Sequence, residues 1–215
     1  LNLIFKISSK VLFMNKGLIV EQGSTAEIFL NPKKNYTKNL LKQSEKISKD
    51  LRKKTKPISS NIILEVKDLS LVINNKKIID NINFNIKEGE TIGIIGQSGS
   101  GKTTISRCII GFYKNYVGRI NYNGINVNRI NRFNLSKEIQ LIFQDPYSAL
   151  NPNIKIINQI IEPMKIHFSL NKFELIKQAS EYLSKVKLHE DLYYKYPAEL
   201  SGGERQRVVI ARALC

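Results

Sequence analysis

The sequence has only two cysteines, two histidines and no tryptophan among its 215 residues. Cys108 and Cys215 stand too far apart to suggest a disulfide framework or a zinc site, which favours a reducing compartment. His167 and His189 show no metal-ligand spacing, so a metal site built on them is not expected. No run of 18 apolar residues occurs, and the sequence therefore predicts no membrane-spanning helix.

Acidic residues are also scarce, since 18 Asp and Glu stand against 34 Lys and Arg and leave a net charge of +16. Such a charge is typical of proteins that bind nucleic acid. The lysines, however, are spread along the whole chain without interleaved aromatic residues, which indicates a bias in residue usage rather than a binding stripe. Hydrophobic residues make up 42% of the chain, enough for a core. We expect a folded protein that binds no nucleic acid.

The segment GQSGSGKTT, residues 96–104, fits the phosphate-loop pattern G-x-x-x-x-G-K-[ST]. The run ETIGII before it predicts a buried strand, and the residues after it have helical spacing. Glycines let the backbone aim N–H groups at phosphate, and the helix dipole adds positive potential. Lys102 then supplies a charge for the β- and γ-phosphates, and Thr103 a hydroxyl for Mg²⁺. The predicted nucleotide-binding residues of this loop are Gly96, Ser98, Gly99, Ser100, Gly101, Lys102, Thr103 and Thr104.

The first 61 residues predict small elements followed by a linker. Residues 11–23 predict two short strands around an Asn-Lys-Gly turn. Ser24 is a candidate N-cap, with Glu27 three residues on, and a second helix is expected over about 36–46. The basic, polar stretch that follows contains Pro57 and predicts a linker, which we place at 50–61.

From residue 62 the chain predicts alternating strands and helices. Strands are expected over 63–73, 77–86, 90–95, 118–127 and 138–144, and amphipathic helices between 154 and 192. The segment LSGGERQR, residues 200–207, follows, with Ser201 and Glu204 as a capping box that opens the last helix. Gly202 and Gly203 remove side chains at the mouth of this helix, so a phosphate can reach its bare N–H groups.

The phosphate loop, Gln144 after a strand, and LSGGERQR together resemble the ATP-binding cassette (ABC) ATPases. The strings FQDPYSALNP (143–152) and YPAELSGGERQRVVIARAL (196–214) are similar to the oligopeptide, dipeptide and microcin-type peptide-importer branch. The resemblance runs from about Ile62 to the end. It implies an α/β fold, a P-loop NTPase cassette with a mixed sheet core over 62–150 and a helical subdomain with the signature over 151–215.

Residues 11–41 resemble a different region of the same family, the C-terminal tail. The family usually has His-Pro-Tyr-Thr where this chain has Lys34, Asn35, Tyr36 and Thr37, so only the last two agree. The order implies a central slice of a tandem protein: the tail of a first cassette (1–49), the linker, and the truncated front of a second cassette (62–215). The alternative is an unrelated hairpin that imitates the tail.

The resemblance implies ATP and Mg²⁺ as cofactors. It assigns catalytic roles to Lys102 and Gln144, Mg²⁺ contacts to Thr103 and Gln144, and the γ-phosphate of the other cassette's nucleotide to Ser201, Gly202 and Gly203. The two motifs would therefore serve two different sites. The implied partners are a second cassette, integral membrane permease subunits and, indirectly, a peptide-binding protein, at the cytoplasmic face of the inner membrane.

This chain departs from the family pattern in two features. The strand residue that usually stacks an aromatic ring on adenine is Ile73 here, which predicts weaker base binding. The hydrophobic strand ending in Asp-Glu and the switch histidine do not occur in these residues, so the chain by itself is expected to be inactive. The alternatives are a soluble ABC ATPase that acts on nucleic acid or ribosomes, and an inactive remnant.

Overall fold

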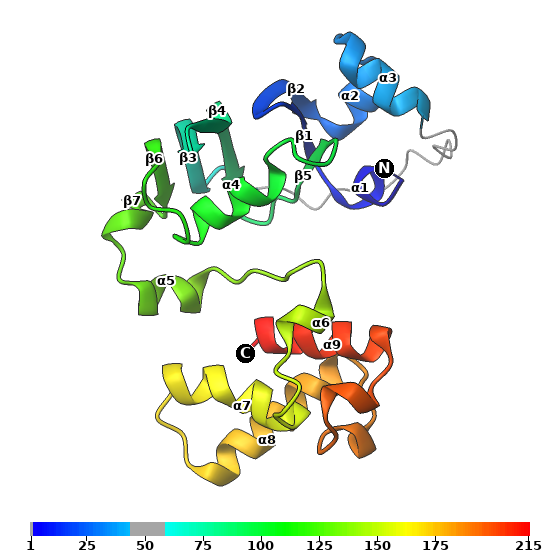
Figure 1. Cartoon of the computed structure of the whole chain (residues 1–215), viewed down its shortest axis with the longest axis vertical. Helices are drawn as coiled ribbons and strands as arrows, with labels where there is room; N and C mark the ends of the chain where they lie inside the picture. The colour runs from blue at the N-terminus through cyan, green and yellow to red at the C-terminus, as the bar shows by residue number, and fades with distance from the viewer. Residues whose placement is uncertain (1, 44–58) are drawn as a thin grey trace. The chain divides into compact units, whose positions relative to one another are not determined.

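The computed structural model describes residues 2–43 and 59–215 and forms two compact units, Leu1–Arg132 and Phe133–Cys215 (Figure 1). All strands of the described residues lie in the first unit. The N-terminal residues share a unit with the β-core, and the second unit begins at Phe133; the expected segments 1–49, 50–61 and 62–215 stay a prediction. Most of the predicted linker, 50–58, lies outside the described residues.

The predicted N-terminal hairpin is confirmed. Strands β1 (Lys10–Asn15) and β2 (Leu18–Ser24) pair antiparallel. Lys16 and Gly17 between them have φ of 45° and 83°, the left-handed pair that a two-residue hairpin turn requires. Helix α1 (Asn2–Ile7) precedes the hairpin. Helices α2 (Thr25–Leu30) and α3 (Asn35–Gln43) follow it. As predicted, the Ser24 hydroxyl caps α2 by accepting from the Glu27 N–H at 3.3 Å.

Strand β1 is the middle strand of a three-stranded sheet, between β2 and β5 (Ile92–Gly96) (Figure 1). It runs parallel to β5, from Lys10 opposite Ile92 to Met14 opposite Gly96. Neighbours on both edges and packing on both faces explain why β1 is a continuous apolar run. Its fully buried side chains are Val11, Leu12, Phe13 and Met14.

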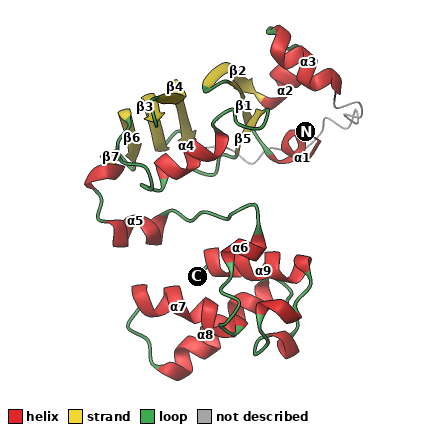
Figure 2. Ribbon diagram, in the orientation of Figure 1, coloured by secondary structure: helices red, strands yellow, loops and turns green. Residues whose placement is uncertain are grey.

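The second sheet is antiparallel and has the order β4-β3-β6-β7. Its strands are β3 (Ile62–Ile73), β4 (Lys76–Lys87), β6 (Val117–Tyr122) and β7 (Ile125–Asn126), followed by the 3₁₀ turn η1 (Val127–Arg129). Helix α4 (Lys102–Ile109) contacts β4 of this sheet and β5 of the other (Figure 2). Ile105 and Cys108 form its buried side, and burial raises the pKa of the Cys108 thiol to about 11.

The second unit is helical. Its elements are α5 (Arg132–Glu138), α6 (Pro146–Ala149), α7 (Ile156–His167), α8 (Lys172–Lys185), η2 (Glu190–Leu192), η3 (Pro197–Glu199) and α9 (Gly202–Ala213). Helices α7, α8 and α9 contact one another around a shared apolar core. This core includes Ile156, Ile160, Met164, Leu183 and Val208. The amphipathic helices expected between 154 and 192 are confirmed.

The strand predicted over 138–144 is wrong. Helix α5 ends at Glu138, and residues 139–144 form neither helix nor strand. Ile142 and Phe143 are about half exposed, at 48% and 47%. A strand needs a partner to bond its backbone, and within the described ranges no segment pairs with this run.

Candidate phosphate-binding site

The loop between β5 and α4 is shaped by glycines. A Cβ at Gly96 would lie 2.4 Å from the Met14 carbonyl oxygen and 2.6 Å from Ser100 Oγ, so only glycine fits there. Gly99 and Gly101 have φ of 77° and 100°, in the left-handed region that glycine enters without strain. Gly101 is also the N-cap of α4. The loop therefore turns sharply and delivers its backbone to the start of a helix.

The Lys102 ammonium is held at this loop by three acceptors. Its Nζ donates to the carbonyl oxygens of Gly96 and Gln97 at 2.9 and 2.7 Å, and to Ser100 Oγ at 3.3 Å. These three acceptors are neutral, so they do not cancel the positive charge. An anion at the start of α4 would meet this charge together with the helix dipole.

The other predicted loop residues divide by exposure. Ser98, Gly99 and Thr103 are exposed, and no atom lies within 4 Å of a Cβ built on Gly99. Ser100 is buried, at 3% exposure, and Thr104 is half-buried. Ser98, Gly99 and Thr103 are thus accessible to a ligand, whereas Ser100 holds the loop together. This open, glycine-built surface fits the phosphates of a nucleotide, and the Thr103 hydroxyl fits the oxygen donors that Mg²⁺ prefers.

The signature segment begins helix α9 as predicted. The Ser201 hydroxyl accepts from the Glu204 N–H at 3.4 Å, and the Glu204 carboxylate accepts from the Ser201 N–H at 2.7 Å. The hydrogen bond that Ser201 Oγ donates to this carboxylate lowers the pKa of Glu204. A Cβ at Gly203 would meet nothing within 4 Å, and one at Gly202 only Tyr147 Oη at 3.8 Å. Packing within the chain therefore does not require either glycine, and both leave the helix mouth accessible.

Gln144 is exposed and directly precedes Asp145, the N-cap of helix α6. Asp145 caps that helix by accepting from the N–H groups of Tyr147 and Ser148 at 3.0 and 3.3 Å, and the bond from Tyr147 leads the contacts that lower its pKa. The Arg205 guanidinium of α9 lies 4.1 Å from the centre of the Tyr147 ring. The sequence did not predict this contact, which joins the Gln144 segment to the signature helix within the second unit.

The phosphate loop lies in the first unit, whereas Gln144 and the signature residues lie in the second. The predicted Mg²⁺ contact shared by Thr103 and Gln144 involves both units and stays a prediction. Ile73 ends β3 and lines a cavity of about 570 Å³ together with Phe112 and Tyr113. Those two rings meet edge to face, with their centroids 5.1 Å apart. Sequence reasoning found Ile73 and did not find these two aromatic neighbours.

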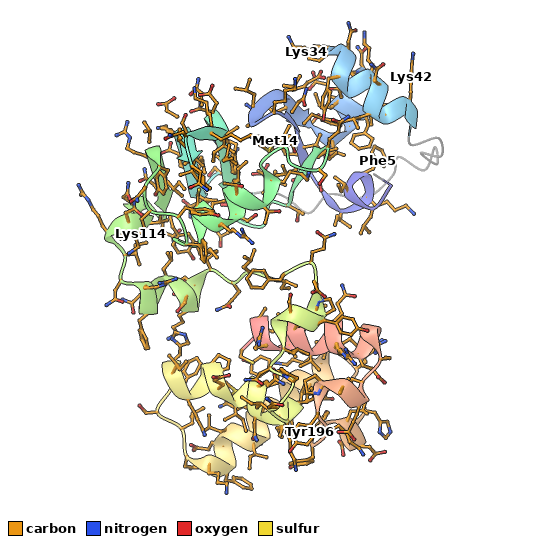
Figure 3. All side chains as sticks on the ribbon, in the orientation of Figure 1. Phe5, Met14, Lys34, Lys42, Lys114 and Tyr196 are labelled. Carbon is orange, nitrogen blue, oxygen red and sulfur yellow. The ribbon has the colours of Figure 1, made fainter. Side chains whose placement is uncertain are left out.

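Tyr36 is the residue near the loop whose role was missed. Its hydroxyl donates to the Met14 carbonyl at 3.0 Å and accepts from the Gln97 N–H at 3.3 Å. Figure 3 labels Met14 on β1, next to the strand that ends in the phosphate loop. The only available signal was the Tyr-Thr pair in the tail-like pattern, which does not say what the tyrosine contacts.

Within the described part of the chain, no helix combines the length and apolar content needed to cross a bilayer.

Three comparisons relate the chain to known proteins. A family model described as "ABC transporter" matches residues 79–215. The putative oligopeptide transport ATP-binding protein YkfD of Bacillus subtilis is 42% identical over 143 residues, 64% of this chain and 43% of that protein. The uncharacterized ABC transporter ATP-binding protein YejF of Escherichia coli is 33% identical over 229 residues, which cover 100% of this chain and 42% of that protein.

Among solved structures, a dimer of the ATP-binding cassette MJ0796 bound to ADP and Pi matches with a TM-score of 0.62 and 31% identity. The match covers 70% of this chain and 68% of that one. The predicted cassette fold is thereby confirmed. The chain spans about half the length, or less, of the curated relatives named above.

Proposed function

The chain belongs to the ABC transporter family, and we propose that it is part of an ATPase that drives the import of peptides across the inner membrane. The observation that carries the ATP-binding role is the glycine-built loop with the Lys102 ammonium at the start of α4. The peptide substrate is supported by relatives named as oligopeptide transport ATP-binding proteins. These are YkfD and, at 42% identity over 161 residues, OppF of Streptococcus mutans.

In this proposal Lys102 holds the β- and γ-phosphates of ATP, and Thr103 and Gln144 hold Mg²⁺. A Mg²⁺ ion held by these two residues would supply positive charge to offset the negative charge that develops on the phosphates. Ser201, Gly202 and Gly203 present the open mouth of α9 to the γ-phosphate of a nucleotide on a second cassette. The remaining partners are permease subunits at the cytoplasmic face of the membrane and, through them, a peptide-binding protein.

Relatives that match the whole chain support the tandem arrangement. YejF and the glutathione import ATP-binding protein GsiA of Escherichia coli, which is 30% identical, each align with 100% of this chain but only 40–42% of their own length. Residues 1–49 would then be the tail of a first cassette, and 62–215 the front of a second. The acid and base that complete ATP hydrolysis would come from outside these 215 residues, so we propose that this polypeptide by itself binds ATP without turning it over.

Titration of the chain with a fluorescent ATP analogue and Mg²⁺ tests the proposal. Lys102→Ala should bind roughly ten- to a hundredfold more weakly, because charge-assisted hydrogen bonds contribute about 1.5–3 kcal/mol. Lys177→Ala, which removes an exposed lysine from α8, is the matched control and should bind like the wild type. Equal affinities of all three proteins would contradict the assigned role of the loop.

A pull-down from the native host separates this function from action on nucleic acid, which the net charge of +16 favours. Co-purification with integral membrane subunits is the expected result. Recovery of RNA or ribosomes in their place would support the second function.

A further inference from the structure

The N-terminal hairpin contacts both ends of the phosphate loop. Strand β1 pairs with β5 as far as Met14 opposite Gly96, the residue at which the loop begins. At the other end of the loop, the Ser100 carbonyl accepts a hydrogen bond from the Gly17 N–H at 3.2 Å. The Gly17 carbonyl in turn accepts from the Asp80 N–H of β4 at 2.9 Å. The hairpin turn therefore lies between the loop and the second sheet of the unit.

The Tyr36 hydroxyl adds a third contact. It bonds β1 through the Met14 carbonyl and the loop through the Gln97 N–H, at 3.0 and 3.3 Å. Gln97 is the first loop residue after Gly96, and its side chain is exposed. Because this N–H is engaged by Tyr36, it serves to hold the loop in place rather than to bind phosphate.

Glu21 fixes the segment that presents Tyr36. Its carboxylate is buried, at 8% residue exposure, and accepts from the N–H groups of Lys33 and Lys34 at 2.7 and 3.2 Å. These two residues immediately precede α3, whose second residue is Tyr36. The contacts therefore run from a buried carboxylate in β2, through the start of α3, to one hydroxyl at the loop.

Although residues 1–49 carry the pattern of a first cassette's tail, we propose that in this chain residues 2–43 complete the unit that holds the phosphate loop, and that Tyr36 is a positioning residue for that loop. The inference rests on the proposed ATP binding. A loop that is already held in its binding conformation loses less conformational freedom when the ligand binds. Removing the Tyr36 hydroxyl frees the first amide of the loop. The variant should therefore bind any triphosphate-containing ligand more weakly.

Tyr36→Phe tests this role, because it removes one oxygen and keeps the ring. The full chain should bind ATP and inorganic triphosphate about three- to tenfold more weakly, the effect of one hydrogen bond. Its melting temperature without nucleotide should fall by only a few degrees, about the effect of one hydrogen bond, and the NMR signal of the Gln97 amide should shift. Tyr194→Phe is the matched control, since Tyr194 lies in the helical unit with 58% of its surface exposed, and it should change none of these values.

The outcomes separate the two proposals. A wild-type chain that binds neither ATP nor triphosphate overturns the proposed function, and this inference with it. A wild-type chain that binds both, alongside a Tyr36→Phe variant of equal affinity, overturns the inference alone.

Glu21→Gln provides a second route should Tyr36→Phe fail to fold. This variant should also weaken triphosphate binding, because it loosens the start of α3. Where both variants fold, the double variant should lose less affinity than the two separate losses combined, since both act on one contact. Unchanged affinity of Glu21→Gln, or additive losses in the double variant, would contradict the chain of contacts.

Discussion

Single glycines decide how closely the hairpin and its neighbours approach each other. Gly17 has φ of 83°, and a Cβ built on it would lie 2.5 Å from the Ile78 carbonyl oxygen of β4. Gly89 has a similar φ of 73°, and a Cβ there would meet nothing within 4 Å. A side chain at either position would therefore meet a similar cost in φ, and the two positions differ in the space around them.

Alanine at these two positions separates strain from crowding. Gly89→Ala should lower the free energy of unfolding by about 1–2 kcal/mol, the cost of a left-handed conformation for a residue with a Cβ. Gly17→Ala should cost at least about 1 kcal/mol more, because the backbone of β4 must also move. Urea denaturation of both variants measures the difference. Equal losses would show that the hairpin turn does not press on β4 as closely as its geometry indicates.

Sequence patterns predicted the local structure of the phosphate loop and the signature because those signals are local, whereas the ligand contacts of their residues stay a prediction. Gly101, Lys102 and Ser201 stand in short motifs whose backbone requirements can be read from neighbouring residues. Tyr36 was not predicted as a loop contact, since it lies 61 positions from Gln97 in the sequence. Spacing alone carries no information about such a distant pair.

At the scale of elements, the attachment of α3 depends on an ionised carboxylate. Burial raises the pKa of Glu21. Four contributions lower it by more in total and leave it below the ordinary value of 4.5: the neighbouring Thr37 hydroxyl, the amides of Lys33 and Lys34, and the Lys34 charge. A carboxylate with a lowered pKa stabilises the fold at pH values above its ordinary pKa. That stabilisation is lost as the pH falls through the lowered pKa.

The wild type should therefore lose more unfolding free energy than Glu21→Gln between about pH 6 and about pH 3. At neutral pH, Glu21→Gln should be less stable than the wild type, because a neutral amide accepts the two backbone hydrogen bonds more weakly than a carboxylate does. Chemical denaturation across this pH range provides the measurement. Parallel pH profiles of the two proteins would exclude Glu21 as the titrating group.

A predicted element is more secure when the sequence also contains a turn signal at its end. Residues 10–24 combine an apolar run with an Asn-Lys-Gly turn, and the hairpin follows directly. The run at 138–144 has similar composition but forms no strand, because a strand depends on a partner elsewhere in the chain. Composition predicts that a segment can be extended, whereas pairing decides whether it becomes part of a sheet.

At the scale of the whole molecule, the division into units was not predicted from the sequence. The expected boundaries followed the motifs, so residues 1–49 were assigned apart from the β-core. The structure joins them through the parallel pairing of β1 with β5. Such a pairing is specified by packing over the whole unit, so no local sequence pattern predicts it.

This pairing predicts that the first unit survives a cut in the chain. A protease site inserted between residues 44 and 58 should yield two pieces that migrate together in gel filtration, because β1 is fully buried from Val11 to Met14. The same cleaved sample in urea should separate. Separation in native buffer would show that the covalent connection, rather than the sheet, keeps the N-terminal segment in place.

The pairing also sets the order in which the first unit can assemble. Ser9 bonds to Thr91 across 82 positions of sequence, so β1 leaves the ribosome long before its parallel partner exists. Until then one edge of the hairpin is an unpaired, strongly apolar strand, which other chains can join. Closure of so long a loop also slows the folding reaction. The phosphate loop is consequently shaped only after β5 joins a strand that was made 82 positions earlier.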